Sequence, residues 1–400
     1  MKIFLALLII ILVVFGGYHL TFRQFKIPLF ARTFYLSGLE FILLGVLLGP
    51  LFFNVLDENS IGGLEPLMAL LLAWVGMLFG FQFEISILRR FPILQLLAAI
   101  GEGLVTLVLV FAGIYLTFGL FPEIPKNMKI IYSLALGAGA ACTAQTGLAL
   151  VASAHSIVNK DSLNLLRYIS SIGGAGALIM YGFVFLLHPE PTSSVSFLYR
   201  IAIEVGNTIV ACIGLLILYT LFLTKWRRSE ELHLIIIGMA VLSSGMASVL
   251  NLSPLLLNFL MGFWLVNLSL EKERIFKFLI SVEKPVYLMI LVFLGAYFKL
   301  DSAWPLILAV SYIVFRSVGK FSGWFLVLAL KPDSKKHNPK LGLALIDQGG
   351  LPLAILLDLL LGFRGEFTLI VVSTAIVAIV FNDIIGIYFQ KRLFVVKSNE

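Results

Sequence analysis

Long apolar stretches dominate this chain, and they limit the folds that it can adopt. A helix needs about 20 mainly apolar residues to cross the hydrocarbon core of a bilayer. Hydrophobic residues make up 60% of the 400 residues and charged residues only 13%. Because soluble domains are far less apolar, we expect an all-α polytopic membrane protein. About thirteen spans can be assigned, near residues 2–20, 34–54, 64–82, 91–120, 129–155, 162–188, 196–223, 231–249, 253–268, 278–299, 303–330, 340–361 and 366–390.

Two of these spans are interrupted near their middle by small, polar or helix-breaking residues. The interruptions read Cys142-Thr143-Ala144-Gln145-Thr146-Gly147 and Asp347-Gln348-Gly349-Gly350. Broken backbone at membrane depth survives only where it is buried in protein or lines a cavity. The two spans run in opposite directions because they are an odd number of spans apart. This pattern points to the binding site of a secondary transporter built from inverted repeats, and we expect Cys142, Thr143, Gln145, Thr146 and Gln348 to line that site.

The basic residues alternate between loops instead of forming one patch. Most of the 29 Lys and Arg fall on one set of alternate loops. The positive-inside rule places these loops in the cytoplasm, with the N-terminus outside the cell (inner) membrane and the C-terminus inside. The alternation also argues against a nucleic-acid partner. The set includes Arg23, Lys26, Arg32, Arg89, Arg90, Lys225, Arg227, Arg228, Lys272, Lys335, Lys336 and Lys391.

Several other classes of site are not favoured by the sequence. Cys142 and Cys212 fall inside spans and the His residues are scattered, so neither a disulfide nor a metal site is expected. The glycine-rich segments 137–140 and 173–176 favour close helix packing over dinucleotide binding. Ser244 lacks the setting of a hydrolase nucleophile. We expect no enzymatic activity, no cofactor and no soluble regulatory domain after the last span.

Several short motifs recur in one order along nearly the whole chain. They are residues 44–50, residues 77–84, Cys142-Thr143-Ala144, residues 253–262 and Arg316-Ser317-Val318-Gly319-Lys320. In these motifs the chain resembles the membrane domain of the monovalent cation:proton antiporter superfamily, which includes sodium/proton exchangers and potassium-efflux proteins. The resemblance implies a homodimer with a core bundle, approximately 64–188 and 303–390, and a dimerisation part, approximately 1–54 and 196–299. It also implies that the broken fifth and twelfth spans cross at the ion site.

The sixth span lacks the carboxylate that the resemblance implies. Cation and proton compete for that group in the family, but here Ser170 and Ser171 lie near the midplane and no acid accompanies them. Hydroxyls can contribute neutral ligands to a cation, but they supply neither the charge nor the titrating group that proton coupling needs. Antiport therefore requires another intramembrane acid.

Three acids could carry the proton instead. Asp347 precedes the second break, although it could equally be the N-cap of the following half-helix. Glu102 lies about halfway through the fourth span, where an interhelical hydrogen bond is the alternative role. Asp383 follows Asn382 in the last span, towards its cytoplasmic end, where a partly solvated cap is the alternative.

Arg316 and Lys320 lie deep in the eleventh span, where unpaired cations are costly. We expect Asp347 or a bound anion as their partner, with snorkelling of Lys320 to the interface as the alternative. The favoured function is exchange of a small monovalent cation or solute for protons by alternating access. The alternatives are an anion or organic-acid transporter, since two cations and two half-helix N-termini favour a negative ligand, and a non-transporting membrane scaffold or sensor.

Overall fold

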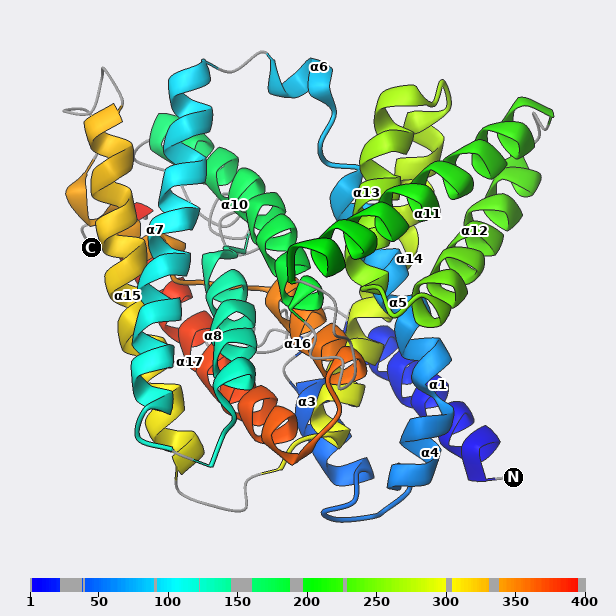
Figure 1. The fold of residues 1–400 in the computed structure, drawn as a ribbon, viewed down its shortest axis with the longest axis horizontal. Helices are drawn as coiled ribbons and strands as arrows, with labels where there is room; N and C mark the ends of the chain where they lie inside the picture. Colours follow the sequence, from blue (N-terminus) through cyan, green and yellow to red (C-terminus); the bar gives the residue numbers. More distant parts are fainter. Residues whose placement is uncertain are drawn as a thin grey trace.

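The structure is a computed structural model that describes residues 2–21, 38, 40–89, 92–121, 123–144, 160–187, 197–225, 229–299, 304–330 and 338–394. Over these ranges it contains helices and no strand (Figure 1). Gln145 and Thr146 lie outside the described residues. The helices are α1 Lys2–Thr21, α3 Glu40–Leu48, α4 Glu58–Gly63, α5 Glu65–Gly80, α6 Ile85–Leu88, α7 Ile93–Phe118, α8 Lys126–Ala141, α10 Lys160–Leu186, α11 Phe197–Lys225, α12 Ser229–Val249, α13 Pro254–Leu268, α14 Lys272–Ala296, α15 Trp304–Leu330, η2 Pro339–Leu345, α16 Gly350–Gly362 and α17 Glu366–Phe394.

The described helices fit a polytopic membrane protein. Seven of them are long and apolar enough to cross a bilayer, and the number is eight if the bent pair η2 and α16 forms one span. The seven are α7, α10, α11, α12, α14, α15 and α17, while α5 and α13 are apolar but shorter. The all-helical membrane fold is confirmed. The count of about thirteen spans remains a prediction.

The helices pack into two groups, which lie in the left and right halves of Figure 1. The site bundle contains α7, α8, α10, α15, η2, α16 and α17. The scaffold bundle contains α1, α3, α4, α5, α11, α12, α13 and α14. Helix α5 is placed in the scaffold bundle because it packs chiefly on α13 and α14. The division into a core bundle and a dimerisation part stays a prediction.

The packing has the symmetry of an inverted repeat. The repeat pairs α3 with α13, α5 with α14, α7 with α15, α8 with η2 and α16, and α10 with α17. If each helix is replaced by its counterpart in this pairing, the contact between α3 and α14 becomes the contact between α13 and α5. Both contacts are present, and both are made by glycines. A Cβ on Gly45 would collide with the Val292 carbonyl, and one on Gly80 would collide with the Phe259 carbonyl. Small residues let membrane helices approach this closely.

Candidate ion-binding site

Two broken helices meet near the middle of the site bundle. Helix α8 ends at Ala141, and residues 142–144 continue without helical structure; η2 and α16 are bent by 47° around residues 346–349. The breaks touch, because the Ala144 N–H donates to the Asp347 carbonyl at 2.9 Å and the Thr143 hydroxyl donates to the Leu345 carbonyl at 3.3 Å. The expected crossing is confirmed for the described residues, which include both halves of the second broken span and one half, α8, of the other.

Glycine makes the second break possible. Gly349 has φ of 68°, a conformation that side chains with a Cβ rarely adopt. A Cβ at this position would also lie 2.8 Å from the Cβ of Ala144. Pro352 follows in the first turn of α16, where its missing N–H costs nothing because that group has no helical partner. The local sequence thus both ends one half-helix and starts the next.

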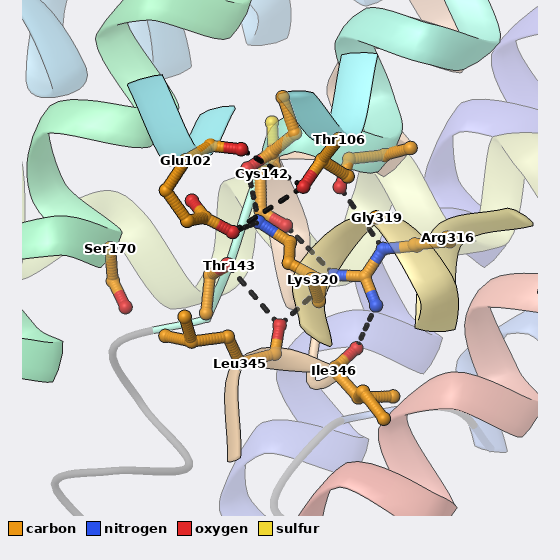
Figure 2. A network of polar contacts seen from close by, with 12 residues as sticks. Glu102, Thr106, Cys142, Thr143, Ser170, Arg316, Gly319, Lys320, Leu345 and Ile346 are labelled. Carbon is orange, nitrogen blue, oxygen red and sulfur yellow. Dashed lines mark hydrogen bonds and ion pairs between the residues drawn. The ribbon is translucent and has the colours of Figure 1, made fainter. Parts of the chain in front are cut away.

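Arg316 on α15 joins the two breaks, as Figure 2 shows. Its side chain is fully buried. The guanidinium donates to the carbonyls of Ala140, Cys142, Leu345 and Ile346. These carbonyls lie at the C-terminal ends of two half-helices, where acceptors lack helical partners and the helix dipole is negative. Arg316 therefore satisfies backbone groups of both breaks.

Lys320, one turn further along α15, forms a buried ion pair with Glu102 on α7 (Figure 2). Its Nζ lies 3.0 Å from Glu102 Oε1, and the two side chains are 0% and 1% exposed. Lys320 also donates to the Ala141 carbonyl at 2.8 Å. The partner of Lys320 is thus Glu102 and not Asp347, which we expected. Glycines allow the pairing, since Gly319 and Gly323 lie directly against Thr106 and Glu102.

Asp347 and Asp383 form a buried pair of acids between the helix break and α17. Both side chains are 4% exposed. They are close neighbours, because Asp383 accepts from Gln348, the residue after Asp347, and because Gly386, one turn after Asp383 on α17, lies directly against Asp347. Asp383 Oδ1 accepts from the backbone N–H of Gln348 at 2.7 Å and of Gly349 at 3.4 Å. Asp383 therefore supports the start of α16, the role considered above for Asp347. Helix α17 approaches closely at Gly386, where a Cβ would lie 2.8 Å from the Asp347 Cα.

Gln348 connects three helices around this acidic pair. Its amide donates to the Gly139 carbonyl at 3.1 Å and to the Tyr312 hydroxyl at 2.7 Å, and its oxygen accepts from Asn382 at 2.9 Å. Among the described residues, Asn382 Oδ1 and Gln390 Oε1 are buried without a hydrogen-bond donor. Both side chains belong to α17. The sequence analysis named Asn382 only as the neighbour of Asp383 and did not name Gln390. Two unpaired amide oxygens near two carboxyls can serve as neutral cation ligands.

The remaining expected ligands are less engaged. The Ser170 hydroxyl donates to the Leu166 carbonyl of its own helix at 2.8 Å, and Ser171 is half-buried. Cys142 Sγ donates to the Ala138 carbonyl at 3.6 Å. In the ranges that the structure covers, no three His, Cys, Asp or Glu side chains are placed to hold a metal ion.

Comparison with known proteins shows the fold. No protein-family model matches the chain, and no curated protein does so either. A solved structure of the sodium proton antiporter MjNhaP1 from Methanocaldococcus jannaschii, at pH 8, superposes with a TM-score of 0.67. The match covers 98% of this chain and 97% of that one, at 19% sequence identity. The chain therefore has the antiporter fold that its motifs suggest.

Proposed function

We propose that this protein is a secondary transporter that exchanges a small monovalent cation for protons by alternating access. The proposal includes the orientation that the basic loops predict, with the N-terminus outside the cell membrane and the C-terminus in the cytoplasm. The shared fold with a sodium proton antiporter supports it. The observation that carries it is the burial of two neighbouring acids, Asp347 and Asp383, beside the crossed breaks.

Two carboxylates in contact inside a protein cannot both remain charged without compensation, because their repulsion is strong where water is excluded. A shared proton or a bound cation removes that repulsion. Arg316 lies close by, since it binds the carbonyl of Ile346, the residue before Asp347, but its N–H groups are occupied by this and other backbone carbonyls. The pair therefore needs a mobile positive charge, which is the property that an exchange site requires.

Counting formal charges gives the same result for the whole buried network. Glu102, Asp347 and Asp383 oppose Arg316 and Lys320, so the fully ionised network carries one excess negative charge. One proton or one monovalent cation neutralises it. Either species alone neutralises the excess charge, whereas both together would leave the buried network with a net positive charge. Binding of one therefore excludes the other. That competition is the basis of antiport.

The charge pattern also favours a cation over an anion. The two buried cations prompted the anion alternative, but Lys320 is paired with Glu102 and Arg316 is held by carbonyls. For a cation, the carboxyls of Asp347 and Asp383 supply charged oxygens. The unpaired oxygens of Asn382 and Gln390 supply neutral ones, and hard cations prefer such ligands.

Flux measurements in proteoliposomes test this function. A panel of lithium, sodium, potassium and rubidium gradients should drive proton movement through the wild-type protein, and Asp347→Asn should abolish it. Glu366→Gln, an exposed acid at the start of α17, is the matched control and should transport normally. Undiminished flux in Asp347→Asn would remove the pair from the mechanism. Absence of flux with every cation in a folded wild type would favour the scaffold or sensor alternative.

We further propose that the protein forms a homodimer through the scaffold bundle. Helix α11 has a row of exposed apolar side chains, Ile209, Val210, Ile213 and Ile217. Lipid or a second copy would cover this row, and the family resemblance favours a second copy. Native mass spectrometry from lipid nanodiscs would distinguish a dimer from a monomer.

A further inference from the structure

A fully buried acid outside the central site, Asp358, lies on α16 about 12 Å along the helix axis from Gly350. Ser253, the N-cap of α13, donates a hydrogen bond of 2.5 Å to Asp358 Oδ2. The Tyr181 hydroxyl of α10 and the Leu255 N–H lie beside the same carboxyl. Asp358 Oδ1 and the Tyr181 hydroxyl are buried without a hydrogen-bond partner among the described residues.

A cavity of about 460 Å³ lies next to this acid, between the two bundles. Its lining includes Leu361 and Gly362, which follow Asp358 by one helical turn. It also includes Leu252 and Pro254, which flank Ser253. Glu65 and Arg364 form an ion pair between the bundles at its rim. The cavity lies at the end away from the basic loops, here termed the outer end because the charge rule predicts it to face outside.

The charge environment of Asp358 differs from that of a structural ion pair. No cation pairs with it in the described part of the chain, and the nearby Arg364 is bound to Glu65. The first N–H groups of α13 reduce the cost of a negative charge but cannot balance it fully. An unpaired buried carboxylate is strongly disfavoured. Asp358 is therefore expected to be protonated while the two bundles enclose it. When the cavity opens onto the carboxyl, a cation can replace the proton.

We propose that Asp358, Ser253 and Tyr181 form an outer exchange site for the monovalent cation, separate from the Asp347–Asp383 pair. The site offers a carboxylate and two hydroxyl oxygens from α16, α13 and α10, which suits a cation with oxygen ligands. Because Ser253 belongs to the scaffold bundle and the other two belong to the site bundle, relative movement of the bundles assembles or separates the ligands. This inference rests on the proposed function, since it supplies the outer station of that transport path.

Infrared difference spectroscopy on the full-length protein in lipid tests the site directly. Lithium, sodium, potassium or rubidium chloride is added in turn, with choline chloride as the control. The wild type should lose protonated-carboxyl absorption on addition of the transported cation. Asp358→Asn should remove one component of this response, and Asp347→Asn should leave that component in place. Glu366→Gln should behave as wild type. An Asp358→Asn spectrum that matches the wild type would overturn the proposal.

Two further measurements separate an exchange site from a structural hydrogen bond. Ser253→Ala retains the carboxyl and should shift the Asp358 component, so the test survives if Asp358→Asn does not fold; an unshifted component would count against the site. In oriented proteoliposomes, Asp358→Asn should raise the KM for the cation about tenfold on the outer side only, as expected for loss of a charged ligand. An equal change on both sides would indicate a structural role. Failure of these tests with normal flux in the wild type would leave the central site unaffected.

Discussion

Lys320 and Glu102 illustrate how one buried pair can stabilise a site without carrying its substrate. Lys320→Ala would leave Glu102 charged and unpaired at 1% exposure, which costs about 3–5 kcal/mol in soluble proteins. The double variant Glu102→Gln/Lys320→Met removes both charges and should recover most of that loss. Chemical denaturation in detergent micelles gives the two stabilities. We expect the double variant to transport, because the Asp347–Asp383 pair remains.

The same double variant can contradict the assignment of the proton carrier. If it folds with wild-type stability but moves no protons, Glu102 is part of the exchange machinery and not only the counter-charge of Lys320. Thr106→Val is a useful control, since it removes the hydroxyl that lies 3.4 Å from Glu102 Oε1 and leaves both charges in place. This control should change neither stability nor transport by a large amount.

Sequence reasoning found most of the buried ionisable residues but not their pairing. Ionisable side chains inside apolar spans are functional candidates, and here they are Arg316, Lys320, Glu102, Asp347 and Asp383. Their partners depend on which helices touch, and no local pattern encodes that. Glu102 meets Lys320 only because glycines on α15 allow α7 to approach. Gln390 was missed, and Asn382 was named only as the neighbour of Asp383, since Asn and Gln give a weaker signal than a charge.

At the scale of elements, the breaks were the strongest sequence signal, and they also give the sharpest prediction. Gly349→Ala combines backbone strain at positive φ with a Cβ lying 2.8 Å from the Ala144 Cβ. Gly365 also has positive φ, but open space surrounds its Cβ position, so Gly365→Ala measures strain alone. We expect Gly349→Ala to reduce transport at least about tenfold, because misplacement of a site by about 1 Å can cost that much or more. Comparable activity in the two variants would show that the crossing tolerates displacement.

The positions of the helices could be predicted well, whereas the helices that α5 contacts could not. Apolar length and helix-breaking residues predicted both half-helices of the second broken span. In the described ranges, each helix that is long enough to span a membrane also falls on a predicted stretch. The placement of α5 with the scaffold bundle depends on its glycine contacts with α13. A glycine in the sequence indicates close helix packing, but it does not indicate which helix packs there.

At the scale of the whole molecule, alternating access requires the site bundle to move against the scaffold bundle. The Glu65–Arg364 ion pair joins the bundles at the outer end, so a covalent bridge there should hold that end closed. Cysteines at positions 65 and 364, joined by a short bismaleimide, should abolish transport, while the unbridged double variant stays active. The native Cys142 and Cys212 are buried and should react poorly.

A bridge within one bundle provides the control for this experiment. Lys272 and Glu84 form an ion pair of 2.7 Å inside the scaffold part of the molecule, so cysteines at these positions should cross-link without loss of transport. If the bridge between positions 65 and 364 also leaves transport intact, the bundles do not separate at the outer end. The outer cavity would then be a static feature, and cations would have to reach the Asp347–Asp383 pair by another route.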